Sequence, residues 1–149
     1  MGLGLTCLLS ASLWLAEAPY EVSLVSPPRL VTERQTAVVE VRYRVPAGAP
    51  VPLKLELKND RGQVISTTSV MVSGTGAHPA RYAIPSLLTT SSVQFVVWLG
   101  NDWRTPLGEI VHSPAARLIT AQRAAAMAAD RERVGADVAR FGRERRPGG

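Results

Sequence analysis

Strict alternation of side-chain polarity over residues 36–45 is the feature that most constrains what this chain can fold into. One set of alternate side chains is apolar or aromatic, and the other is mostly charged or polar. The first set is Ala37, Val39, Val41, Tyr43 and Val45, and the second is Thr36, Val38, Glu40, Arg42 and Arg44. Successive side chains of a β-strand point to opposite faces, so this pattern predicts an antiparallel strand with one face in a core and one in water.

The same two-residue period recurs in short segments along the middle of the chain. These segments cover residues 20–25, 53–58, 63–72, 80–84, 93–99 and 109–113. Turn-forming sequences separate them, such as the predicted hairpin at Asn59-Asp60-Arg61-Gly62 and the pair Pro27-Pro28, which indicates a kinked edge strand. No helical pattern lies between them. Residues 19–114 therefore predict an all-β, antiparallel immunoglobulin-like or fibronectin III-like sandwich of about seven strands.

The N-terminal segment is apolar over residues 2–16 and then reads Ala16-Glu17-Ala18. An apolar run of this length, followed by a small-x-small sequence, is typical of a signal peptide, so we expect residues 1–18 to be removed. The alternative is a short uncleaved anchor. Cys7 is the single cysteine, so the expected mature protein contains no disulfide, and we expect it to be secreted or to lie in the periplasm or cell envelope.

The C-terminal segment, residues 115–149, is rich in alanine and arginine and predicts a basic helical tail. Eight arginines and four acidic residues give it most of the net charge of +5, so the high charge does not indicate a nucleic-acid-binding fold. Met127, Val134, Val138 and Phe141 form one narrow apolar stripe. Either this stripe docks on a partner or an anionic surface, or the tail is a solvated extension whose apolar residues rest on the sandwich.

Several stretches of the strand region together resemble a class of immunoglobulin-like modules. They are Val25-Ser26-Pro27-Pro28, the strand at residues 36–43, the stretch 53–59, and the stretch 96–104 that ends in Gly100-Asn101-Asp102-Trp103-Arg104. Such modules occur in secreted bacterial and algal proteins, often beside catalytic domains that act on polysaccharides. The resemblance covers residues 20–113 and implies a non-catalytic accessory or spacer module, associated with carbohydrate.

The loop at residues 100–106 holds the candidate ligand-binding residues. Trp103 could stack on the apolar face of a sugar ring, while Asn101, Asp102 and Arg104 bond its hydroxyls. In the alternative reading, Trp103 folds back over the open end of the sandwich and Asp102 caps a turn.

Trp98 lies out of phase with the apolar positions of its predicted strand. It could form a flat stacking platform with Tyr82, or it could lie under a neighbouring loop or the tail helix.

Catalytic and metal-binding signals are weak in this sequence. His78 and His112 are the two histidines, and neither has a Cys, Asp or Glu at a zinc-ligand spacing. No serine lies in a Gly-x-Ser-x-Gly turn. We therefore expect no metal, no cofactor and no enzymatic activity. Two functions follow: a secreted module that binds polysaccharide or a protein, or an envelope-associated protein that uses its basic helix as the contact.

Overall fold

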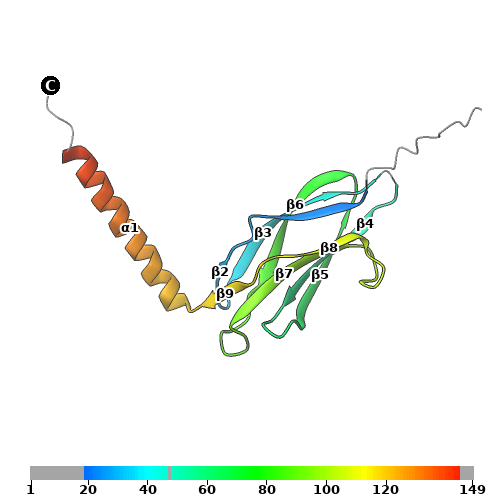
Figure 1. Cartoon of the computed structure of the whole chain (residues 1–149), viewed down its shortest axis with the longest axis horizontal. Helices are drawn as coiled ribbons and strands as arrows, with labels where there is room; N and C mark the ends of the chain where they lie inside the picture. Colours follow the sequence, from blue (N-terminus) through cyan, green and yellow to red (C-terminus); the bar gives the residue numbers. More distant parts are fainter. Residues whose placement is uncertain (1–18, 47, 145–149) are drawn as a thin grey trace, which may run out of the picture.

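The computed structural model describes residues 19–46 and 48–144, and this part of the chain is mostly β-strand with one C-terminal helix (Figure 1). The predicted signal segment, with Cys7, lies outside the described residues. The elements are β1 (Glu21–Val25), β2 (Leu30–Thr32), β3 (Thr36–Arg44), β4 (Val51–Lys58), β5 (Val64–Val72), β6 (Thr75–Ala83), β7 (Ser92–Leu99), β8 (Leu107–His112), β9 (Ala116–Ile119) and α1 (Ala121–Glu144). The prediction of an all-β body followed by a helix is confirmed.

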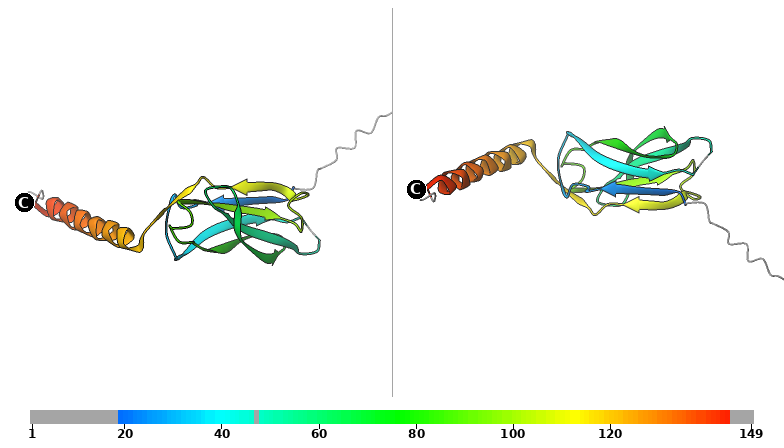
Figure 2. Two further views of the ribbon diagram at one scale, coloured as in Figure 1. Left: turned by 90° about the horizontal axis from the view of Figure 1, so that it is seen from below. Right: turned by 90° about the horizontal axis from the view of Figure 1, so that it is seen from above.

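The strands form two sheets that share one core. The smaller sheet has the order β1-β3-β6, and the larger has the order β2-β9-β7-β4-β5, with β8 also paired to β7. Figure 2 shows the strands from two opposite sides. Val39 and Val41 of the smaller sheet are buried with Leu55 and Phe95 of the larger one. The rings of Tyr82 and Phe95 meet edge to face across the core, with their centroids 4.9 Å apart.

The alternation in β3 follows the prediction. Val39, Val41 and Val45 are buried, while Glu40 and Arg42 are exposed on the other face. The predicted hairpin between β4 and β5 is also confirmed, because Gly62 takes a φ of 73° and its N–H donates to the carbonyl of Asn59 at 3.0 Å.

The first predicted strand is β1, at an edge of the smaller sheet, and an additional strand, β2, follows it in the larger sheet. β1 pairs antiparallel with β3, whereas β2 pairs parallel with β9 in the larger sheet. Ser26, at a φ of 46°, and the two prolines after it carry the chain from one sheet to the other. β2 was not predicted, because a strand of three residues is too short to show an alternation of side chains.

The boundary between sandwich and tail lies further along the chain than predicted. We expected the last strand to stop at Pro114 and the tail to begin at residue 115. Instead, β9 follows Pro114, pairs with both β2 and β7, and buries Ala116, Leu118 and Ile119. Pro114 has no N–H to donate, so it interrupts the ladder, but the chain pairs again with β7 as β9.

The connection between the predicted strands at residues 63–72 and 80–84 is shorter than expected. Gly74, at a φ of 64°, makes the turn, and β6 already begins at Thr75. β6 also contains Pro79, which pairs with Glu40. A proline is tolerated there because β6 is an edge strand, where a missing N–H leaves no neighbour unpaired.

The helix α1 begins where Thr120 caps it, since the Thr120 hydroxyl accepts the N–H of Arg123 at 3.1 Å. None of its residues is buried, and it extends away from the sheets (Figure 2). The apolar stripe is open: Val134, Val138 and Phe141 are 57%, 66% and 65% exposed. The alternative in which this stripe rests on the sandwich is therefore wrong. No helix in the described ranges is long and apolar enough to cross a membrane.

Candidate functional site

A cleft of about 390 Å³ lies on the outer face of the larger sheet, on the side away from the core. This volume is at the small end of the range seen for small-molecule sites. The cleft is lined by Glu56, Lys58, Gly62, Val64, Trp98, Trp103, Ile110 and His112.

The floor of the cleft follows from the alternation in β7. Phe95, Val97 and Leu99 point into the core, so Trp98 points to the opposite face. Trp98 is only 3% exposed, and its indole N–H has no hydrogen-bond partner among the described residues. A buried donor without a partner is uncommon in native proteins, so this indole makes the floor of the cleft unusual.

A β-bulge brings a second apolar side chain to the same face. The pairing of β4 with β5 shifts between Leu57, opposite Ser66, and Lys58, opposite Val64. One extra residue on β5 therefore lies between two successive pairs, and Val64 takes the same face as Lys58. Without this bulge, the alternation would direct Val64 toward the other face of the sheet.

The loop after β7 places Trp103 beside the cleft. The Asp102 carboxylate accepts the N–H of Arg104 at 3.0 Å, and the Asp102 carbonyl accepts the N–H of Thr105 at 3.0 Å. Trp103 stays 61% exposed, and the Arg104 guanidinium carbon lies 5.2 Å from the centroid of its ring. This distance suits a cation–π contact.

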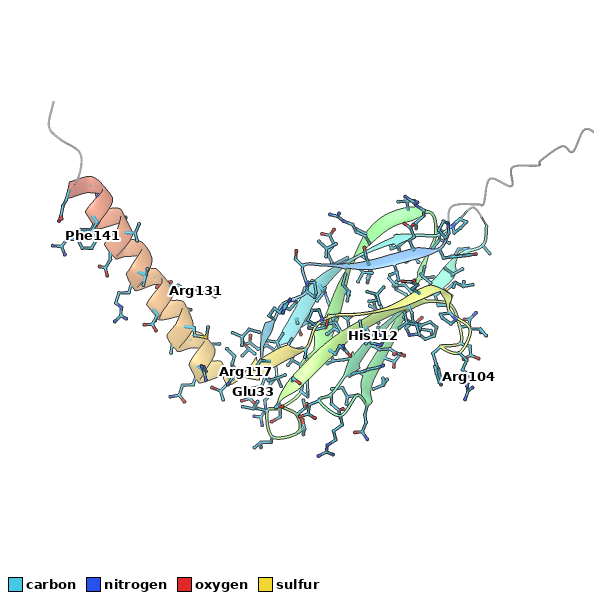
Figure 3. The ribbon with its side chains drawn as sticks, in the orientation of Figure 1. Glu33, Arg104, His112, Arg117, Arg131 and Phe141 are labelled. Carbon is cyan, nitrogen blue, oxygen red and sulfur yellow. The ribbon has the colours of Figure 1, made fainter. Side chains whose placement is uncertain are left out.

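The structure tests the alternative reading of this loop, in which Trp103 folds back and Asp102 caps a turn. Asp102 caps the turn, as the alternative reading predicted. Trp103, however, remains largely open and lines the cleft. Asn101, Asp102 and Arg104 are exposed on the loop and do not line the cleft; Figure 3 shows Arg104 on the loop, apart from His112 on β8. Of the four predicted ligand-binding residues, only Trp103 therefore lines the cleft.

The proposed platform of Trp98 and Tyr82 is wrong. Tyr82 is opposite Ala37 on the inner face of the smaller sheet and is buried against Phe95. Burial raises the pKa of the Tyr82 hydroxyl well above its ordinary value, and the negative charge of Glu56 adds to this effect. The other reading, in which Trp98 lies under a neighbouring loop, is nearer to the structure, since Trp98 and the loop residue Trp103 line the same cleft.

The polar wall of the cleft was not predicted as a site. Lys58 Nζ lies 3.3 Å from His112 Nε2, although the two residues are 54 positions apart. The alternation in β4 does place Glu56 and Lys58 on the wet face. Nothing in the sequence, however, gives the pairing of β4 with β7 and of β7 with β8 that brings His112 to them.

The search for metal ligands gives no cluster. Within residues 19–46 and 48–144, no three His, Cys, Asp or Glu side chains come together in a way that could hold a metal ion.

Comparison with protein-family models finds no matching family, and comparison with curated proteins finds no matching relative.

Proposed function

We propose that this chain is a non-catalytic, secreted binding module with an immunoglobulin-like or fibronectin-like sandwich, and that it binds carbohydrate in the cleft between Trp98 and Trp103. The strand order supports the fold. With β1, β3 and β6 as strands A, B and E, and β5, β4, β7 and β8–β9 as C′, C, F and G, the two sheets match that type of sandwich.

The observation that carries the binding proposal is the combination of Trp103 and Trp98 in one cleft. Trp103 offers an exposed ring on which the apolar face of a sugar can stack. Trp98 lies beneath it, and its buried ring gives the cleft an apolar floor. Lys58, His112 and Glu56 supply polar groups at the wall, so the cleft combines apolar surface with a few hydrogen-bonding groups, as ligand sites do.

Polysaccharide retention and calorimetry on the full chain test this proposal. Trp103→Ala should abolish retention on the polysaccharide that the native chain binds best, because the stacking surface is lost. Leu88→Ala is the matched control, since Leu88 is 91% exposed and does not line the cleft. Equal retention by the native chain and the Trp103→Ala variant would rule out this site, as would failure of the native chain to bind any glycan in a broad panel.

A second function is favoured by the open stripe on α1. Here the chain is an envelope-associated interaction protein, the sandwich is a scaffold, and the helix is the contact. The observation in its favour is that Val134, Val138 and Phe141 are all exposed on a helix that buries no residue. Co-sedimentation with anionic and with zwitterionic vesicles tests whether a membrane surface is the partner. Binding that needs anionic lipid and weakens with salt would favour the membrane.

A further inference from the structure

The apolar positions of α1 follow the spacing of a coiled coil. Alternating steps of three and four residues connect Ala124, Met127, Arg131, Val134, Val138 and Phe141. These are the a and d positions of a heptad repeat, and five of the six are apolar. This pattern predicts a seam along one side of the helix, suited to a second helix.

The apolar side of the helix has no partner within the described residues. It is 24 residues long and makes no buried contact with the sheets. Most of the stability of helices in proteins comes from packing an apolar face against a neighbour, and α1 lacks such a neighbour among the described residues. Its two described ion pairs, Arg133 with Asp130 and Arg140 with Glu144, are exposed and contribute little.

The charge of α1 favours a protein partner over an anionic membrane. The helix carries five arginines and four carboxylates, so its net charge is only +1. Membrane-surface helices carry an excess of Lys and Arg on the polar face. The remaining basic charge of the tail lies outside the helix, at Arg117 before it and in the residues after it.

The residues on the two sides of the seam favour a parallel pair. On each side, residues seven positions apart form a column along the helix. One column contains only small residues: Ala121, Ala128, Gly135 and Gly142. The other column is Arg123, Asp130, Asp137 and Glu144. In a parallel pair, the acidic column of each helix faces the small column of the other. In an antiparallel pair, Asp130 would instead face Asp137 of the other copy in the middle of the seam, with like charges opposed, and only the end pair of Arg123 with Glu144 would attract.

The parallel arrangement also accommodates the one charged seam residue. Arg131 would lie beside the Arg131 of the second chain at the seam. Asp130 precedes it in the sequence and lies in the neighbouring column. The space around Gly135 is open, with no atom near the position of an added Cβ. A close approach on this side allows each Arg131 to reach the carboxylate of the other copy's Asp130.

We propose that α1 pairs with the α1 of a second copy of this chain in a parallel two-stranded coiled coil, through Met127, Val134, Val138 and Phe141. This inference rests on the second function proposed above and names its partner. The pair would hold two sandwiches at the same end of the coiled coil. Two Trp103 clefts in one particle could then bind a single long ligand together.

Sedimentation equilibrium of the full chain tests the pairing. We use chain concentrations from about 10 μM to about 1 mM, because a seam this short should associate weakly. The native chain should shift from one copy to two over this range. Val134→Asp should weaken self-association by more than about tenfold, because it buries unpaired carboxylates at the seam. Ala136→Asp introduces the same charge on the opposite side of the helix and should leave the shift unchanged.

Both variants should keep the melting temperature of the sandwich, because neither residue is buried against it. A native chain that stays monomeric throughout the range would overturn the pairing. A dimer that Val134→Asp leaves intact would also overturn it, because the contact would then lie elsewhere. Neither result depends on glycan retention, so each can be told apart from a failure of the cleft.

Disulfide cross-linking tests the direction of the pair. In a Cys7→Ser background, Val134→Cys should give a covalent dimer on mild oxidation, because like d positions meet in a parallel pair. Ala136→Cys should remain a monomer under the same conditions. If the two variants cross-link equally, or if neither does, the parallel seam is wrong.

Discussion

Ser113 bonds to Phe95 with both its main chain and its side chain. The N–H of Phe95 donates to the Ser113 hydroxyl oxygen at 3.0 Å, and the N–H of Ser113 donates to the Phe95 carbonyl at 2.8 Å. Ser113 is buried between β8 and β9, next to Pro114. Its hydroxyl therefore takes the place of a main-chain acceptor for the N–H of Phe95, at the step from β8 to β9.

Ser113→Ala should lower the free energy of unfolding by about 1–3 kcal/mol, because the buried N–H of Phe95 loses its acceptor. Urea denaturation measures this loss. Ser69→Ala, on an exposed position of β5, is the control and should change the value by less than about 0.5 kcal/mol. A Ser113→Ala variant as stable as the native chain would mean that this bond does not help to hold the step between β8 and β9 against β7.

Asp60 should make stability depend on pH in the acid range. Its carboxylate accepts the N–H of Ser91 at 3.1 Å and the Ser91 hydroxyl at 3.0 Å, and these bonds lower the pKa of Asp60 below its ordinary value of 3.8. A lowered folded pKa means that the ionised carboxylate stabilises the fold above the unfolded pKa. This contribution is lost as the pH falls through the folded pKa.

The Asp60→Asn variant should therefore melt at a lower temperature than the native chain at neutral pH, because it lacks the ionised carboxylate. The gap between the two melting curves should narrow once the pH falls below about 4. Thermal melts at a series of pH values check this. A gap that stays constant down to the lowest pH would show that the charge of Asp60 plays no part.

Tyr82→Phe should leave the protein as stable as before, or more stable by up to about 1 kcal/mol. The Tyr82 hydroxyl is buried and has no hydrogen-bond partner in the part of the chain that the structure describes, so removing it leaves no other group unpaired. The ring contact with Phe95 remains in the variant. A loss of more than about 1 kcal/mol in denaturant unfolding would show that the hydroxyl does have a partner.

Gly108→Ala should destabilise the fold by about 2 kcal/mol or more, because Gly108 has a φ of 81° and an added Cβ would lie 2.5 Å from the carbonyl oxygen of Tyr20. The matched control is Gly135→Ala, which lies in α1 with open space around it and a helical backbone. That change should not destabilise the sandwich. If the two alanine variants unfold at the same denaturant concentration, the close approach of β8 to Tyr20 is wrong.

The alternation of apolar and polar side chains was enough to predict the class of fold and the side of most strands that faces the core. Val39, Leu55 and Phe95 are buried as their alternation indicates, because which face a strand buries is a local property of its sequence. The two missed strands, β2 and β9, are too short to show a period. They hold their places through partners far along the chain, such as Val31 with Leu118.

The cleft could be predicted only in part, for the same reason. Trp103 is identifiable as an aromatic residue in a turn-rich loop. Lys58 and His112 come together only through the register of three strands, and Val64 through a bulge. Registers depend on contacts between distant segments, which a single sequence does not display.

Binding of carbohydrate in the cleft is tested most directly by NMR of the tryptophan indole N–H groups. The isotope-labelled full chain is titrated with an oligosaccharide of the polysaccharide that it retains best. The signals of Trp98 and Trp103 should shift together and saturably, because both rings line the cleft that the ligand fills. Saturable binding that leaves both signals in place would contradict the cleft as the binding site.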